Sequence, residues 1–129
     1  MRSPSILLVE DDRALREALA EVLTDEGYDV AGAANGREAL ERLAANHPDL
    51  IVLDLVMPVM DGWAFREAQR RNPALASIPT VVLSASFPPD SPSLRSLGAE
   101  AVLSKPIGVD RLIGALRGLL EPSSATLSH

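Results

Sequence analysis

Acidic residues directly follow two of the most apolar runs in this 129-residue chain. Glu10-Asp11-Asp12 comes after the apolar run 6–9, and Asp54 comes after the apolar run 50–53. A carboxylate in apolar surroundings is costly unless it is paired, binds a metal or lies at the end of its strand. The positions of these acids therefore indicate a functional site, because packing alone would not place carboxylates there.

Two further apolar runs lead to a hydroxyl and an ammonium group. Ser84 follows the run 80–83, and Lys105 comes shortly after the run 101–103. If the four runs are strands of one parallel sheet, their carboxyl ends lie at the same edge, where such sheets bind ligands. We therefore expect carboxylates, one hydroxyl and one lysine to share a crevice there.

A crevice of this composition restricts the chemistry. Like charges close together raise carboxylate pKa values or require a cation. Oxygen ligands without His or Cys fit Mg²⁺ better than Zn²⁺. An aspartate beside such an ion can attack phosphorus and carry an acyl phosphate. The metal and the lysine would neutralise the transferring oxygens, and the serine hydroxyl could donate to one of them.

The elements that must position these groups alternate between strand and helix. Four apolar runs do not alternate with polar residues, which is typical of parallel strands buried on both faces. A weaker run, 28–33, alternates in part and is expected at the sheet edge. Helix-face spacing, caps and stop signals predict four longer helices between or after the strands. These predicted helices cover about residues 15–26, 35–44, 61–72 and 109–120.

The crossover after residue 84 has the weakest helical pattern. Pro88, Pro89 and Pro92 disfavour an early helix start, because proline lacks the backbone donor that a helix interior needs. About two turns, near residues 93–97, are therefore expected. Five β-α repeats predict an α/β fold with a five-stranded parallel sheet covered by helices on both faces. We expect one domain over residues 1–121, followed at 122–129 by a disordered tail or a truncated linker.

Composition excludes several classes of function. The net charge is −6, and basic residues are scattered apart from Arg70-Arg71, so no direct nucleic-acid binding is expected. The chain has no cysteine, which excludes disulfides and thiolate metal sites. No stretch reaches the ~20 apolar residues that cross a bilayer. We expect a soluble, cytoplasmic protein without membrane contact.

Four segments make the chain resemble a receiver domain of the response regulators in two-component signalling. They are "ILLVEDD", "LIVLDLVMPVMDG", "PTVVLSAS" and "VLSKPI", in the order and at the approximate spacing of that family. The resemblance covers residues 6 to about 120. It implies a flavodoxin-like, doubly wound fold with strand order 2-1-3-4-5.

The resemblance also implies roles for individual residues. Asp54 matches the phosphoacceptor, Ser84 the switch hydroxyl and Lys105 the phosphate-contacting lysine, with a cis bond to Pro106. The implied ligands of Mg²⁺ are Asp11 directly, Glu10 through water, the carboxylate of Asp54 and the backbone carbonyl of Val56. Asp12 is the third acid of its run and is expected to cap the first helix instead.

The implied function is that of a phosphoacceptor and not of an enzyme with a separate substrate. A sensor histidine kinase or phosphotransfer protein would donate to Asp54, and the domain would promote its own phosphorylation and dephosphorylation. The signal would pass to a downstream protein or an output domain. A homodimer that depends on phosphorylation is one state open to it.

Two departures from the family pattern fall on the surface that the family generally uses for output. Val102 stands where the family often has Tyr or Phe, so the usual aromatic flip coupled to Ser84 cannot occur. Phe87-Pro88-Pro89 replaces the usual start of the fourth helix. We therefore expect an intact phosphorylation site beside an atypical output surface.

Three rival functions are consistent with parts of the sequence. An aspartate-based phosphatase usually needs a second acid two residues after the nucleophile, where Val56 stands. A receiver-like binding module that takes no phosphate would not need Ser84 and Lys105. A flavin-binding module would need a phosphate cradle where residues 10–13 are acidic. Taken alone, the acidic run at 10–12 could also be a solvated helix start.

Overall fold

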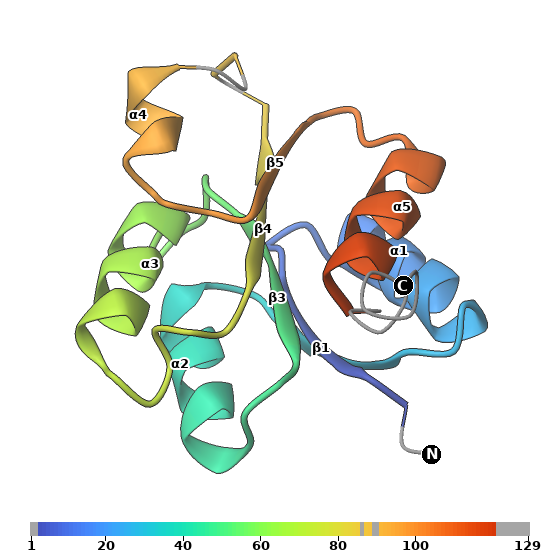
Figure 1. Ribbon diagram of the computed structural model, residues 1–129, viewed down its shortest axis with the longest axis horizontal. Coiled ribbons are helices and arrows are strands. Elements are labelled where there is room, and N and C mark those ends of the chain that lie inside the picture. The colour runs from blue at the N-terminus through green and yellow to red at the C-terminus, as the bar shows by residue number, and fades with distance from the viewer. Residues whose placement is uncertain (1–2, 86, 89–90, 121–129) are drawn as a thin grey trace, which may run out of the picture.

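The computed structural model describes residues 3–85, 87–88 and 91–120 and consists of alternating strands and helices (Figure 1). Pro89 and the expected tail at 122–129 lie outside the described residues. Among the described elements, no helix is both long and apolar enough to span a bilayer. The elements are β1 (Ser5–Val9), α1 (Arg13–Asp25), β2 (Asp29–Ala33), α2 (Gly36–Ala45), β3 (Leu50–Asp54), α3 (Gly62–Arg71), β4 (Thr80–Ser84), α4 (Pro92–Arg95), β5 (Ala101–Ser104) and α5 (Val109–Leu120).

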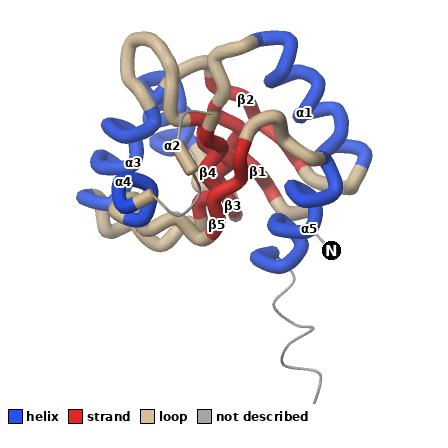
Figure 2. Tube along the Cα trace, turned by 90° about the horizontal axis from the view of Figure 1, so that it is seen from above, coloured by secondary structure: helices blue, strands red, loops and turns tan. Residues whose placement is uncertain are grey.

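The five strands form one parallel sheet in the order β2-β1-β3-β4-β5. This is the predicted flavodoxin-like order, and the weakest strand, β2, lies at the edge as expected. Helices α1 and α5 cover one face, and α2, α3 and α4 cover the other (Figures 1 and 2). The sheet therefore has both faces buried, which explains why its central strands are apolar throughout.

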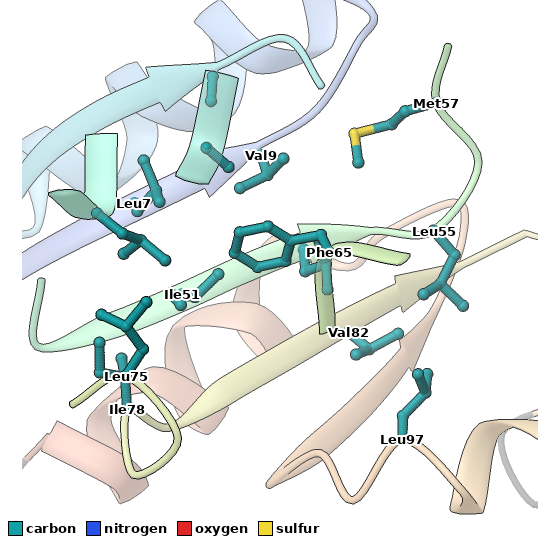
Figure 3. Close-up of a cluster of buried hydrophobic side chains, with 14 of the residues drawn as sticks. Leu7, Val9, Ile51, Leu55, Met57, Phe65, Leu75, Ile78, Val82 and Leu97 are labelled. Atoms are coloured by element: carbon teal, nitrogen blue, oxygen red, sulfur yellow. The ribbon is translucent and has the colours of Figure 1, made fainter. Parts of the chain in front are cut away.

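Two hydrophobic clusters hold these layers together. Successive side chains of a strand point to opposite faces, so the same strand supplies both clusters. On the α2–α3 side, the ring of Phe65 lies over Ile51 and Val82 and is fully buried (Figure 3). On the α1–α5 side, Leu23 and Leu116 pack with the remaining strand residues. This arrangement fixes the strand register and with it the positions of the residues that follow each strand.

Helix starts are capped by polar side chains at or just before the predicted helix starts. Asp12 Oδ1 accepts the Leu15 N–H at 3.1 Å, so Asp12 caps α1. Asn35 caps α2, and Asp61 caps α3 by accepting the Ala64 N–H at 2.9 Å. Such caps satisfy backbone donors that a helix leaves unpaired.

Helix α4 differs from the prediction in both length and start. It has 4 residues, Pro92–Arg95, where about two turns near 93–97 were expected. Pro92 begins the helix, with Ser91 as its cap, because the first helical position needs no N–H donor. Gly98, with a φ of 61°, follows the single turn and directs the chain into β5. Pro92 therefore starts this helix and does not delay it, and the helix is shorter than predicted.

Two glycines of helix α5, Gly114 and Gly118, are suitable positions for a stability test. A Cβ at Gly114 or Gly118 would meet nothing within 4 Å, so neither makes room for a neighbour. Replacing either with Ala is expected to raise the free energy of unfolding by about 1 kcal/mol, because Ala restricts the unfolded chain and favours helix. Urea denaturation measures this change.

The matched control is Gly62→Ala at the start of α3. There a Cβ would lie 2.5 Å from the Asp54 carbonyl oxygen, so this variant must lose stability. Equal effects at Gly62 and Gly118 would contradict the packing described for these two helices.

Candidate functional site

The sheet brings four predicted site residues to one edge. Asp54 is the last residue of β3 and Ser84 the last residue of β4. Glu10 directly follows β1, and Lys105 directly follows β5. Because β1, β3, β4 and β5 are parallel and adjacent, these positions all lie at the carboxyl ends of the strands.

Three carboxylates converge at this edge. One carboxylate oxygen each of Glu10, Asp11 and Asp54 lies within 4.8 Å of the others. Glu10 and Asp54 are buried, with 1% and 4% of their surface exposed, whereas Asp11 is exposed. Three oxygen donors with one open side could hold a hard divalent cation, and Mg²⁺ suits such a donor set. Val56 lies two residues beyond Asp54, and its side chain is turned to solvent, 64% exposed.

Lys105 supplies the positive charge in this cluster. Its Nζ donates to Glu10 Oε1 at 2.9 Å and lies 3.2 Å from Asp54 Oδ1. Burial lowers the pKa of Lys105, but the hydrogen bond to Glu10 and the charges of Asp54 and Glu10 outweigh it, so the pKa is raised. The lysine is therefore held as an ammonium that bridges β1 and β3. The peptide bond from Lys105 to Pro106 is cis, as expected.

Glu10 is fixed by contacts on both carboxylate oxygens. Besides Lys105, the Asp12 N–H donates to Glu10 Oε2 at 3.1 Å. The Glu10 backbone oxygen accepts from Arg16 at 2.7 Å. Burial raises the pKa of Glu10, while the bonds from Lys105 and Asp12 lower it without cancelling that effect. Glu10 is thus a carboxylate held in a fixed position, and its burial disfavours the charged form. A bound cation would stabilise that charge.

Ser84 is hydrogen-bonded to a segment that the sequence did not connect with it. Its Oγ accepts the Phe87 N–H at 3.3 Å and lies 3.5 Å from the Phe87 carbonyl oxygen. The Phe87 ring meets the Trp63 ring edge to face, with centroids 5.8 Å apart. An aromatic pair therefore joins the loop after β4 to the start of α3. Trp63 also packs against the core, but its contact with Phe87 has no signal in the local sequence pattern.

The loop after β3 explains the motif that follows Asp54. The Gly62 N–H donates to the Leu55 carbonyl at 2.8 Å, which brings α3 against the end of β3 so closely that only glycine fits. Val59 has a φ of 68° and is 75% exposed. A β-branched residue in this region is strained by roughly 1–3 kcal/mol. The close approach of Gly62 fixes both ends of this loop around the acidic cluster.

Arg66 and Gln69 are buried polar residues that periodicity did not identify. Arg66 NH1 donates to Gln69 Oε1 and to Thr80 Oγ1, both at 2.8 Å. Arginine on a helix normally faces water, so nothing in the spacing marked this one as internal. It ties α3 to the start of β4.

Comparison with known proteins agrees with this geometry. The family profile described as response regulator receiver domain matches residues 6–117. The response regulator MprA of Mycolicibacterium vanbaalenii is 40% identical over 119 residues, which cover 89% of this chain and 49% of MprA. The chain thus spans about half the length of this relative.

Solved structures of similar proteins have the same fold. The receiver domain of a signal transduction histidine kinase from Syntrophus aciditrophicus is 33% identical, with a TM-score of 0.86 over 98% of this chain and 97% of that one. The chemotaxis response regulator CheY4 of Vibrio cholerae is 31% identical, with a TM-score of 0.84 over 92% of this chain and 99% of that one.

The charge cluster leads to a prediction about stability. Changing Asp54 to Asn removes one of three converging carboxylates, while Lys105 keeps Glu10 as its partner. Without divalent cations, we expect the free energy of unfolding to rise by about 1 kcal/mol, because like-charge repulsion falls. Thermal melting in a chelating buffer measures it.

Asp29→Asn, an exposed change of the same chemistry on β2, serves as the control and should alter stability by less than about 0.5 kcal/mol. A lower melting temperature for Asp54→Asn than for the unmodified chain would refute the repulsion argument.

Proposed function

This chain belongs to the response regulator receiver domain family, and from that membership we propose that Asp54 is its phosphoacceptor. A receiver domain of a two-component system takes up a phosphoryl group, and the site described above suggests where. The observation that carries the proposal is the position of Asp54, buried among two other acids with the Lys105 ammonium 3.2 Å from its carboxylate oxygen. Glu10 shares this burial, the acidic neighbours and the lysine, but both of its carboxylate oxygens already accept hydrogen bonds, from Lys105 and from the Asp12 N–H.

The proposed reaction is a phosphoryl transfer from a phosphohistidine. An Asp54 carboxylate oxygen attacks phosphorus, the new P–O bond forms and the P–N bond breaks. The electron pair of the P–N bond stays on the imidazole nitrogen, which takes up a proton. The product is an acyl phosphate, which water later hydrolyses. Transfer of this kind depends mainly on positioning and on neutralising the three phosphoryl oxygens.

We propose that Glu10, Asp11, Asp54 and the backbone carbonyl of Val56 hold Mg²⁺ at this site. The all-oxygen donor set fits that ion, and the raised pKa of Glu10 indicates a site that gains from a cation. When bound, Mg²⁺ supplies positive charge to the transferring oxygens. Glu10 is anchored by Lys105 and the Asp12 N–H, so its carboxylate is held for an indirect, water-mediated contact.

Lys105 and Ser84 are proposed to contact the phosphoryl group itself. The raised pKa of Lys105 keeps its ammonium charged, as contact with an anion requires. The Ser84 hydroxyl engages the Phe87 backbone at 3.3 and 3.5 Å, the weak end of hydrogen-bond geometry. Donation to a phosphoryl oxygen would replace these bonds, so phosphorylation is expected to alter the Phe87 segment.

The partners are proposed from family membership. A sensor histidine kinase or a phosphotransfer protein would donate the phosphoryl group in the cytoplasm, and the domain would assist its own phosphorylation and dephosphorylation without acting on a separate substrate. Residues 1–121 are proposed as the receiver domain and 122–129 as a tail or linker. The signal would pass through β4, α4, β5 and α5 to an output domain or a separate protein, with a phosphorylation-dependent homodimer as one route. On that surface Val102 is only half-buried, and its aliphatic side chain packs against the core.

Intact-mass analysis tests the phosphoacceptor. Incubation with Mg²⁺ and a small acyl phosphate should add the mass of one phosphoryl group, which should be absent in Asp54→Ala and formed more slowly in Lys105→Ala. Asp61→Ala, which changes a helix cap outside the carboxylate cluster, should still be modified. Modification of Asp54→Ala would show that another residue accepts the group.

The tryptophan reports on the same site. Trp63, the only tryptophan, contacts Phe87, and the Gly62 N–H beside it binds the Leu55 carbonyl next to Asp54. We expect Mg²⁺ to change Trp63 fluorescence, and Asp11→Ala to abolish the response because a metal ligand is lost. Asp25→Ala, on the opposite end of α1, should respond as the unmodified chain does. An unchanged response in Asp11→Ala would place the metal elsewhere.

A further inference from the structure

A groove runs between α3 and the segment that follows α4. It has a volume of about 470 Å³, which is within the range of small-molecule sites. Figure 1 shows α3 and α4 side by side on one face of the sheet. The residues that line the groove are Trp63, Arg66, Glu67, Arg70, Arg71, Ser96 and Leu97.

The groove is basic in an otherwise acidic protein. The residues that line the groove include three arginines and one glutamate, a net charge of +2, whereas the whole chain has a net charge of −6. Positive charge is therefore concentrated in the groove. Charge gathered in a hollow attracts groups of the opposite sign and favours their association.

Arg66 contributes a charge at the base of the groove that no hydrogen-bonded acid neutralises. It is only 4% exposed. Its guanidinium donates to neutral acceptors, namely the carbonyls of Leu97 and Gly98, Gln69 Oε1 and Thr80 Oγ1, each at 2.8 Å. Burial lowers the pKa of Arg66, and the more distant charge of Glu100 opposes that effect. Its field is less screened by water than that of an exposed arginine.

Arg70 and Arg71 place further donors along the groove. Arg70 NH1 bonds to the Ser96 carbonyl at 2.8 Å, which joins α3 to the opposite wall. Arg71 pairs with Glu67 at 3.1 Å, but the side chains are 77% and 67% exposed, so this pair is weak and exchanges readily with water. Each guanidinium has five N–H donors, so both arginines keep donors for an incoming carboxylate.

The groove also has apolar surface. Trp63 lies at its end nearest the start of α3, and the buried Leu97 forms part of its lining. A free inorganic anion would leave this surface unused, whereas a peptide could use both parts. A nucleic acid is disfavoured, because the remainder of the chain is strongly acidic and repels a long polyanion.

We propose that the groove between α3 and residues 92–98 binds an acidic segment of a partner protein. Carboxylates of that segment would contact Arg70 and Arg71, and an apolar side chain would pack on Trp63. The site is distinct from the carboxylate cluster that includes Asp54. Binding there needs no phosphoryl group, so this inference does not rest on the proposed function.

A labelled short peptide of alternating Glu and Leu provides the probe, with the same peptide carrying Gln in place of Glu as comparison. Fluorescence anisotropy measures affinity, and the emission of Trp63 reports contact in the groove. We expect the Glu peptide to bind and to change Trp63 emission, with affinity that falls as salt rises. The Gln peptide should bind at least about tenfold more weakly.

Arg71→Glu and Arg37→Glu form a matched pair of variants. Both arginines are highly exposed, at 77% and 73%, both pair with a glutamate four residues away, and both changes alter net charge equally. Only Arg71 lines the groove. Arg71→Glu should lower the affinity for the Glu peptide by about tenfold or more, and Arg37→Glu should change that affinity little.

Several outcomes would overturn the proposal. An equal loss of affinity in Arg71→Glu and Arg37→Glu would mean that long-range attraction, and not a site in the groove, holds the Glu peptide. If the Gln peptide binds as tightly as the Glu peptide, carboxylates are not recognised. If a single-stranded oligonucleotide displaces the labelled Glu peptide at a lower concentration than the unlabelled Glu peptide does, the groove is a polyanion site instead. If Arg71→Glu fails to fold by circular dichroism, Arg71→Gln with Arg37→Gln repeats the comparison.

Discussion

The repulsion among Glu10, Asp11 and Asp54 is the constraint on which the structure of the site depends. Three carboxylates within 4.8 Å of one another, two of them buried, repel one another unless positive charge or hydrogen bonds compensate. Lys105, which directly follows β5, supplies one positive charge, and the Asp12 N–H donates to the Glu10 carboxylate. The apolar strands supply the remaining energy, because their burial on both faces keeps the strand ends in register. The hydrophobic core thus stabilises a charge arrangement that is unfavourable by itself.

A second, oppositely charged network holds the other end of α3. Arg66 joins this helix to the carbonyls after α4, and Arg70 adds a bond to the Ser96 carbonyl. These contacts position a crossover whose helix is a single turn, too short to bury much surface of its own. The edge-to-face contact between Phe87 and Trp63 lies between the two regions. Ser84 is therefore connected to the start of α3 through its hydrogen bond with the Phe87 backbone and the contact between the Phe87 and Trp63 rings.

Much of this architecture was predictable because the signals are local. Apolar runs gave the strands, and Asp12, Asn35 and Asp61 marked helix starts through hydrogen bonds that span only three residues. The prediction was wrong for the fourth helix, where Pro92 was taken as a barrier although proline suits a first helical position. Arg66 was missed because its burial depends on carbonyls 31 and 32 residues away. No spacing rule on α3 could have indicated those acceptors.

The sequence by itself determined the strand and helix order, the helix caps and the residue types that can serve phosphoryl chemistry, because these follow from backbone periodicity and side-chain chemistry. Only the tertiary structure decided how those residues meet. It set Lys105 between Glu10 and Asp54, engaged Ser84 with Phe87, and surrounded the buried Arg66 with neutral acceptors. The physical reason is that these contacts join segments far apart in the chain. Their distances depend on the packing of the whole sheet, which no local pattern encodes.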